Sequence, residues 1–197
     1  MKLPLFKTLP NVYDPSEDSF LLMDALESIK DSNPTTIWEI CCGTGSVGAY
    51  AKYLFPNAHV VCSDKYSDPC INTKDTFIRN SLRGDVVQMD LLENVKKHSV
   101  DLILCNPPYV PSEYHLEGID AAWAGGLHGN SAVTIPLINI VEQILSKDGQ
   151  LLLLLLKVNF NDNLQELCNA RSLSFKCIIE RQCGREYLYV FSIKRLH

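Results

Sequence analysis

The segment Asn106-Pro107-Pro108-Tyr109 combines residue types that could hold a planar nitrogen for alkylation. The side-chain oxygen of Asn106 and the backbone carbonyl of Pro107 are two acceptors for the two hydrogens of an amide or exocyclic amine. The prolines restrict the preceding backbone to extended geometry, so both acceptors are placed in advance. Tyr109 can pack against the planar group, and catalysis would be mainly proximity and orientation. The competing interpretation is that Asn-Pro-Pro only begins a loop.

A glycine-containing turn earlier in the chain could admit a nucleoside cofactor. Gly43, Gly45 and Gly48 match a G-x-G-x-x-G pattern after an apolar run. Asp64 follows the first glycine by roughly 20 positions, where a carboxylate can hold both ribose hydroxyls. Taken alone, the pattern fits NAD as well as S-adenosylmethionine, and it equally fits a tight strand–helix turn with no ligand.

Three carboxylates favour S-adenosylmethionine over a dinucleotide. Glu39, Asp64 and Asp90 lie within or just after three consecutive predicted strands. A pyrophosphate would gain nothing from Glu39, whereas the methionine end of S-adenosylmethionine carries an ammonium that an acidic neighbourhood favours. Asp90 stands where it can take the adenine amino group. Each carboxylate alone would also suit a solvated loop, but together they predict a cleft for a cationic nucleoside.

The apolar pattern places these residues at the carboxyl ends of strands. Strands are predicted at residues 36–41, 59–62, 85–89, 100–105, 151–156, 174–180 and 186–193, and helices at residues 47–54, 69–80, 131–145 and 162–171. A first helix is predicted from Asp14, as its cap, to Ile29. Residues 111–130 are predicted to form a long loop.

This order of elements predicts an α/β fold with a Rossmann-like, seven-stranded class I methyltransferase sheet. Alternating strands and helices predict a mostly parallel sheet with helices on both faces. The six-leucine run Leu151–Leu156 suits a strand that is buried on both sides. The fourth strand should lie beside the first, at the switch point where ligands bind. The last two strands should pair as a C-terminal antiparallel hairpin.

Composition predicts one globular domain over residues 1–197, because 46% of the residues are hydrophobic and 21% are charged. The net charge of −5 argues against a protein that grips a nucleic-acid backbone. The eight cysteines include no C-x-x-C pair and no zinc-finger spacing, so we expect reduced thiols and no metal site. Neither a signal peptide nor a membrane-spanning run is visible. We therefore expect a cytoplasmic protein, with the nucleus as the alternative.

Four stretches carry a family resemblance. They are residues 12–22 (VYDPSEDSFLL), 106–111 (NPPYVP), 118–126 (GIDAAWAGG) and 181–186 (RQCGRE). With these stretches the chain resembles the eukaryotic and archaeal HemK-like release-factor glutamine methyltransferases over nearly its whole length. The resemblance implies methylation of N5 of the glutamine in the Gly-Gly-Gln loop of a class I translation termination factor. S-adenosylmethionine would be the methyl donor and S-adenosylhomocysteine the product.

The resemblance also implies roles for particular residues. Tyr13 and Ser19 would lie near the methionine end of the cofactor, although packing at a helix start would explain them too. The cofactor-binding residues would be Tyr13, Ser19, Glu39, Gly43, Gly45, Asp64, Lys65, Asp90, Leu91 and Asn106. The catalytic residues would be Asn106, Pro107 and Tyr109, and Pro108 would join them in binding the substrate.

Two departures from the family pattern lie in the cofactor site. Cys41 stands where the family has glycine, and a side chain there would narrow the methionine pocket. The family's Asp-Ile-Asn-Pro is replaced by Asp64-Lys65-Tyr66-Ser67, which leaves open how the adenine is packed.

The resemblance further implies a partner, a small zinc-binding activator subunit, in place of the N-terminal helical domain of bacterial relatives. The predicted strand 85–89 would be a sheet edge, where Val86 and Val87 could pair with that subunit. The alternative is an edge that is covered by a loop of the chain itself.

Other functions fit parts of the same pattern. The Asn-Pro-Pro-Tyr segment would serve an N6-adenine or N2-guanine nucleic-acid methyltransferase equally well, and a protein-lysine substrate also remains open. A non-enzymatic binding module with a degraded cofactor site is the third alternative, because Cys41 departs from the glycine pattern.

Overall fold

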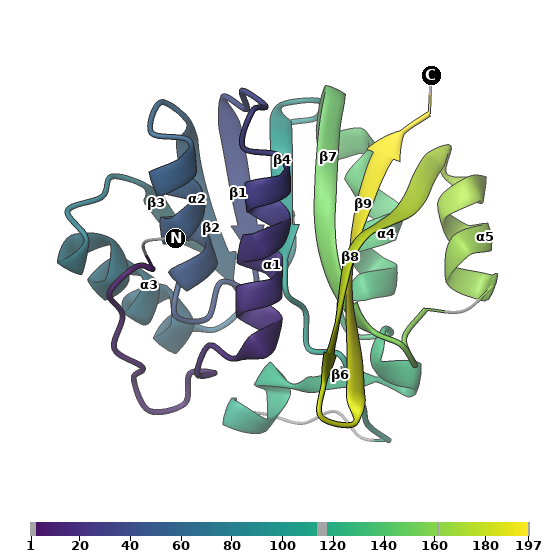
Figure 1. Ribbon diagram of the computed structural model, residues 1–197, viewed down its shortest axis with the longest axis horizontal. Coiled ribbons are helices and arrows are strands. Elements are labelled where there is room, and N and C mark those ends of the chain that lie inside the picture. The colour runs from purple at the N-terminus through teal and green to yellow at the C-terminus, as the bar shows by residue number, and fades with distance from the viewer. Residues whose placement is uncertain (1–2, 114–117, 161, 197) are drawn as a thin grey trace.

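A seven-stranded sheet runs through the computed structural model, which describes residues 3–113, 118–160 and 162–196 (Figure 1). Its strand order is β3-β2-β1-β4-β7-β9-β8. The strands are β1 (Thr36–Ile40), β2 (His59–Asp64), β3 (Asp85–Gln88), β4 (Val100–Cys105), β7 (Leu145–Leu156), β8 (Leu173–Cys183) and β9 (Glu186–Arg195).

The sheet is parallel from β3 to β7 and antiparallel at β9 and β8. β4 lies beside β1, so the chain reverses its direction of winding between these two strands. The C-terminal strands β8 and β9 form the expected hairpin, and β3 is one edge of the sheet. The predicted class I methyltransferase fold is therefore confirmed, including its switch point.

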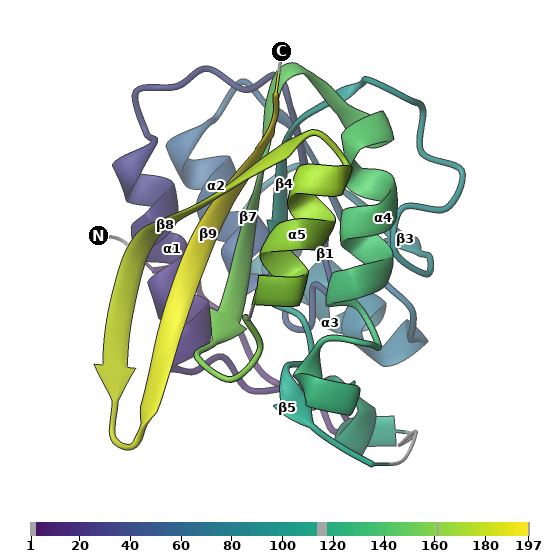
Figure 2. The ribbon, with the colours of Figure 1, turned by 90° about the vertical axis from the view of Figure 1, so that its right-hand side faces the viewer.

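Helices cover both faces of the sheet, with α1 and α2 on one side and α4 and α5 on the other (Figure 2). The six-leucine run supplies both cores, because Leu152 and Leu154 face the first layer and Leu151 and Leu153 face the second. The helices are α1 (Glu17–Ser28), α2 (Ser46–Leu54), α3 (Ser67–Arg79), α4 (Thr134–Ile144) and α5 (Asp162–Ala170).

The start of α1 corrects one prediction. The N-cap is Ser16, which makes no side-chain capping bond, and not Asp14. Asp14 instead accepts a hydrogen bond from the hydroxyl of Thr8, so its side chain bonds to the segment that precedes the helix.

β7 begins earlier than predicted, at Leu145. Pairing with β4 nevertheless jumps from Leu145 to Gln150. Residues between these two pairs thus form a bulge in a strand that is longer than predicted.

The predicted loop at residues 111–130 is also more ordered than expected in its described part. Two short strands, β5 (Val110–Pro111) and β6 (Ala124–Gly126), pair in parallel as a separate small sheet. The 3-10 helices η1 (Gly118–Ala122) and η2 (Leu127–Gly129) flank β6. Residues 114–117 of this predicted loop lie outside the described residues.

Within the part of the chain that the structure describes, no helix is long and apolar enough to cross a membrane.

Candidate active site

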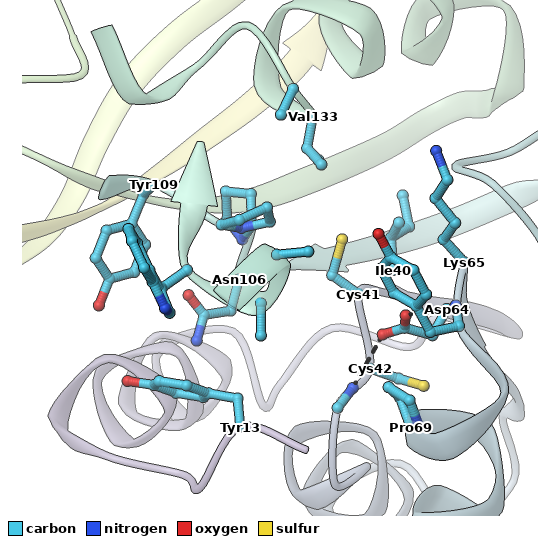
Figure 3. Close-up of a pocket in the computed structure, with 18 of the residues that line it drawn as sticks. Tyr13, Ile40, Cys41, Cys42, Asp64, Lys65, Pro69, Asn106, Tyr109 and Val133 are labelled. Atoms are coloured by element: carbon cyan, nitrogen blue, oxygen red, sulfur yellow. Dashed lines mark hydrogen bonds between the residues drawn. The ribbon is translucent and has the colours of Figure 1, made fainter. Parts of the chain in front are cut away.

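A cavity of about 630 Å³ opens at the carboxyl ends of the parallel strands (Figure 3). Its walls come from the ends of β1 to β4, from the segment before α1, and from β5 and β6. Most of the predicted site residues line it: Tyr13, Ser19, Glu39, Gly43, Asp64, Lys65, Asp90, Leu91, Asn106, Pro107, Pro108 and Tyr109. The fold therefore gathers the cofactor and substrate residues predicted from the sequence into one chamber.

Gly45 is the exception, because it lies behind the cavity wall. It caps α2 in the left-handed conformation, with φ of 71°, and its N–H donates to the carbonyl of Cys42 at 2.6 Å. A Cβ at this position would come within 2.5 Å of Thr73 on α3. Gly45 thus lets the turn after β1 pack against α3, and it shapes the cavity indirectly.

Asp64 holds the turn after β1 at the cofactor end of the cavity. Its Oδ2 accepts a hydrogen bond from the N–H of Gly43 at 3.3 Å (Figure 3), and its Oδ1 accepts one from the N–H of Tyr66 at 3.1 Å. Burial raises the pKa of the Asp64 carboxyl, although these N–H groups oppose the effect. The carboxylate ends β2 and lines the cavity.

Lys65 and Asp90 form an ion pair across the ends of β2 and β3. Their charged atoms are 2.9 Å apart, and both side chains remain substantially exposed. The hydrogen bond and charge of Asp90 raise the pKa of Lys65. Lys65, which stands where the family has an apolar residue, is therefore held by Asp90, the carboxylate that we assigned to the adenine amino group from the sequence.

Glu39 is buried inside β1 rather than free at its end. Its side chain is 4% exposed, and its Oε2 accepts a hydrogen bond from the N–H of Gly48 at 3.0 Å. Burial raises the pKa of the Glu39 carboxyl to about 8. The carboxyl is therefore mostly protonated at neutral pH, and it gains its charge there only if a cation approaches.

Cys41 adopts the left-handed conformation, with φ of 56°, at the position where the family has glycine. Figure 3 shows its sulfur in the cavity, between the sides formed by Asn106 and Asp64. A hydrogen bond with Cys105 and burial raise the pKa of the Cys41 thiol. The thiol is thus a neutral group that narrows the chamber.

A buried carboxylate, Asp18, organises the other end of the cavity. It lies in the first turn of α1, is 2% exposed, and has three donors converging on its Oδ2. These donors are Asn106 Nδ2 at 3.1 Å, the Tyr13 hydroxyl at 3.1 Å and the Tyr109 hydroxyl at 3.0 Å. Its Oδ1 accepts from the N–H of Ser19 at 2.6 Å and from the hydroxyl of Ser19 at 3.2 Å. Such a network compensates the burial of the charge.

These bonds orient the amide of Asn106. With Nδ2 turned toward Asp18, its Oδ1 is buried and has no hydrogen-bond partner in the described structure. A buried acceptor without a donor is costly, which points to a missing ligand group. The neighbouring carbonyl of Pro107 offers the second acceptor that an NH2 group needs.

The two phenols beside Asp18 remain donors at neutral pH. Burial, followed by the charge of Asp18, raises the pKa of Tyr13 to about 12 and that of Tyr109 further. Neither phenol is available as a general base.

Sequence reasoning missed three residues of this region, namely Asp18, Trp123 and Asn159. Asp18 precedes Ser19 in the stretch that carries the family resemblance, and that adjacency was the available signal. Trp123 lines the cavity from the turn before β6 and is 37% exposed. Asn159, after β7, is fully buried and has no local sequence signal.

The donor set fits S-adenosylmethionine. One cavity is lined both by the carboxylates of Asp64 and Asp90, which suit the nucleoside, and by the amide of Asn106. The described residues include no group of three or more His, Cys, Asp or Glu side chains that could hold a metal ion.

Comparisons with known proteins find similar sequences over nearly the whole chain. The family model of the methyltransferase small domain matches residues 6–169. Methyltransferase HEMK2 of Homo sapiens is 31% identical over 194 residues, which cover 94% of this chain and 90% of the relative. The eRF1 methyltransferase catalytic subunit mtq2 of Schizosaccharomyces pombe is 30% identical in an alignment 213 positions long, which covers 96% of this chain and 92% of the relative.

A solved structure is similar as well. It is that of the E. cuniculi Mtq2–Trm112 complex, described as responsible for the methylation of the eRF1 translation termination factor. The match has a TM-score of 0.70 at 25% identity and covers 94% of this chain and 99% of that chain.

Proposed function

The chain belongs to the methyltransferase small-domain family and, within it, to the HEMK2-like methyltransferases, and from this premise we propose that it methylates a translation termination factor. The acceptor is N5 of the glutamine in the Gly-Gly-Gln loop of a eukaryotic class I factor. S-adenosylmethionine is the donor and S-adenosylhomocysteine the product.

The observation that carries this proposal is the unpartnered Oδ1 of Asn106. Asp18 holds that amide by its NH2 group, so its oxygen is left without a donor, and the carbonyl of Pro107 follows directly in the chain. An uncharged primary amide supplies two hydrogens for these two acceptors. Its nitrogen lone pair is delocalised, so fixing its position and orientation is the main help that a protein can give.

The remaining residues have roles in holding the donor, which supplies a methyl group on a positively charged sulfur. Asp64 would bind the ribose hydroxyls, Asp90 would accept from the adenine amino group, and Lys65 would pack on the adenine. Tyr13, Ser19 and Glu39 would hold the methionine end, whose ammonium would favour the ionised form of Glu39. The acceptor nitrogen gains the methyl group and releases one proton to solvent.

The proposal includes a small zinc-binding activator subunit at the edge strand β3. β3 pairs only with β2 within the described sheet, so its other side offers unpaired backbone groups. α3 lies against β3 and exposes two isoleucines: Ile71 is 56% exposed and Ile78 is 75% exposed. An edge strand beside exposed apolar side chains suits a partner that adds a strand.

Mass spectrometry tests the substrate directly. The chain and an activator subunit are incubated with S-adenosylmethionine and an intact termination factor, and the Gly-Gly-Gln peptide is then sequenced. A gain of one methyl group on the glutamine side chain is expected. Methylation that persists after Gln→Ala in this loop would point to another residue. Methyl transfer to RNA or DNA, with none to the factor, would favour the nucleic-acid alternative.

A further inference from the structure

Asn159 uses every hydrogen-bonding group of its side chain to join three parts of the fold. Its Oδ1 accepts from the N–H of Leu156 at 2.7 Å, at the end of β7. Its Nδ2 donates to the carbonyl of Tyr109 at 2.8 Å and to the carbonyl of His128 at 3.1 Å. The residue is 0% exposed, so these bonds form in a dry environment where each is costly to break.

Two of these partners belong to segments that pack against each other beside the reacting centre. Tyr109 ends the Asn-Pro-Pro-Tyr segment and lines the cavity, and His128 belongs to η2, which follows β6. The two segments are in close contact, because a Cβ on Gly129 would collide with the carbonyl of Tyr109 and one on Gly125 would lie 2.7 Å from the carbonyl of Pro108. Asn159 therefore donates to both segments at the place where they meet.

The same strand holds the reacting segment at both ends. At its start, Cys105 pairs with Leu153 of β7 in the parallel ladder. At its end, the carbonyl of Tyr109 is held by Asn159, whose side chain is itself closed onto β7 at Leu156. The acceptor groups of Asn106 and Pro107 lie between these two fixed points, and two prolines stiffen the span.

We propose that Asn159 is a positioning residue for methyl transfer: it sets the place of the Pro107 carbonyl and the Asn106 side chain through the carbonyl of Tyr109. This inference rests on the proposed function. Asn159 is absent from the cavity lining, and it reaches the acceptor site only through the backbone carbonyl of Tyr109. Its loss should therefore lower kcat while leaving the affinity for S-adenosylmethionine in place.

The test compares two buried asparagines of one cluster. Asn159→Asp keeps the size of the side chain and its acceptor for Leu156, but it turns a carboxylate toward two carbonyls. Asn130→Asp is the matched control, because Asn130 is 5% exposed and its Nδ2 donates at 2.8 Å to the backbone carbonyl of Asn159, not to Tyr109. The chain is assayed with its activator subunit on an intact termination factor, and thermal melting is recorded for each variant.

Asn159→Asp should reduce kcat by about 100-fold, the effect of a displacement of roughly 1 Å at a reacting centre. Its dissociation constant for S-adenosylmethionine, measured by calorimetry, should stay within about threefold of the wild-type value. Asn130→Asp should lower the melting temperature by about as much as Asn159→Asp does, but its kcat should stay within about threefold of the wild-type value.

Equal losses of kcat in the two variants, in proportion to their melting temperatures, would overturn the inference and leave Asn159 a purely structural residue. Should Asn159→Asp fail to fold, Asn159→Ser, which can donate to only one of the two carbonyls, is compared with Asn130→Ser in the same way. A wild-type chain that leaves the glutamine unmodified would reject the proposed function. Wild-type activity together with an unchanged kcat in the Asn159 variant would reject this inference alone.

Discussion

Asn106 donates a hydrogen bond through Nδ2 to Oδ2 of Asp18, at 3.1 Å. This contact decides which way the Asn106 amide faces, because a carboxylate accepts only from its NH2 end. The same contact favours asparagine over aspartate at position 106, because an aspartate there would place its carboxylate against the buried carboxylate of Asp18. The pairing can be tested by exchanging the two residue types.

Asn106→Asp should abolish detectable turnover, because two carboxylates would meet in a buried site. The double exchange Asp18→Asn with Asn106→Asp restores a donor opposite an acceptor, so it should recover measurable turnover, at least about tenfold above the detection limit of the assay. Steady-state assays on the termination factor measure both effects. The pairing would lose its support if the double variant were no better than Asn106→Asp.

Asn106→Ala and Asp64→Ala should separate the two ends of the cavity. The first removes an acceptor for the reacting nitrogen, so kcat should fall on the order of 100-fold while cofactor affinity stays nearly intact. The second removes the ribose carboxylate, so cofactor affinity should fall by roughly tenfold or more. Calorimetry with S-adenosylmethionine and single-turnover assays check the division. A comparable loss of cofactor binding in both variants would contradict it.

Glu39 should make the stability of the cofactor-free chain depend on pH. The pKa of its carboxyl is raised from 4.5 to about 8 by burial, so the folded state retains a proton that the unfolded state releases. The resulting stabilisation is complete below pH 4.5 and is lost as the pH rises through 8. Between pH 5 and pH 8.5, the melting temperature of the wild type should therefore fall more than that of Glu39→Gln, which keeps an acceptor for the N–H of Gly48. If the melting temperatures of the two proteins changed equally with pH, the ionisation of Glu39 would not destabilise the fold, and the prediction would be wrong.

The sequence predicts those parts of the site that follow from local pattern. The strand Val100–Cys105 has the predicted bounds, and it delivers Asn106 to the switch point of the sheet. Its apolar run and the prolines that follow suffice for this, because strand burial and proline stiffness are local properties. The carboxylates Asp64 and Asp90 are placed in the same way, because Asp64 ends β2 and Asp90 comes shortly after β3.

Contacts that join distant segments could not be predicted. Asp18 lies 88 positions from Asn106, and Asn159 lies 50 positions from Tyr109. Nothing in the periodicity around either residue distinguishes it from an ordinary polar residue at a helix start or in a loop. Glu39 shows a related limit, since the acidic residue was visible in the sequence but its raised pKa depends on the depth of its burial.

A substitution of Ile78, the more exposed of the two isoleucines on α3, tests the proposed partner surface beside β3. Ile78→Glu should weaken the complex with the activator subunit by at least about tenfold, because a charge would be buried against an apolar contact. Its affinity for S-adenosylmethionine should not change. Leu196→Glu is the control, since Leu196 is 56% exposed and lies after β9, at the other half of the sheet. Titration calorimetry with the purified subunit compares them, and equal affinities for the two variants would place the partner elsewhere.

Cys41→Gly should bind S-adenosylmethionine more tightly than the wild type, by about threefold or more. Removing its side chain widens the cavity between the sides formed by Asn106 and Asp64, where the sulfur lies. The fold should tolerate the change, because the φ of 56° at this position costs a side-chain-bearing residue about 1–2 kcal/mol and costs glycine little. Cys105→Ala removes the hydrogen-bond partner of Cys41 but leaves its thiol in the cavity, so it should keep the wild-type affinity. Weaker binding by Cys41→Gly in calorimetry would mean that the thiol contacts the ligand and does not crowd it.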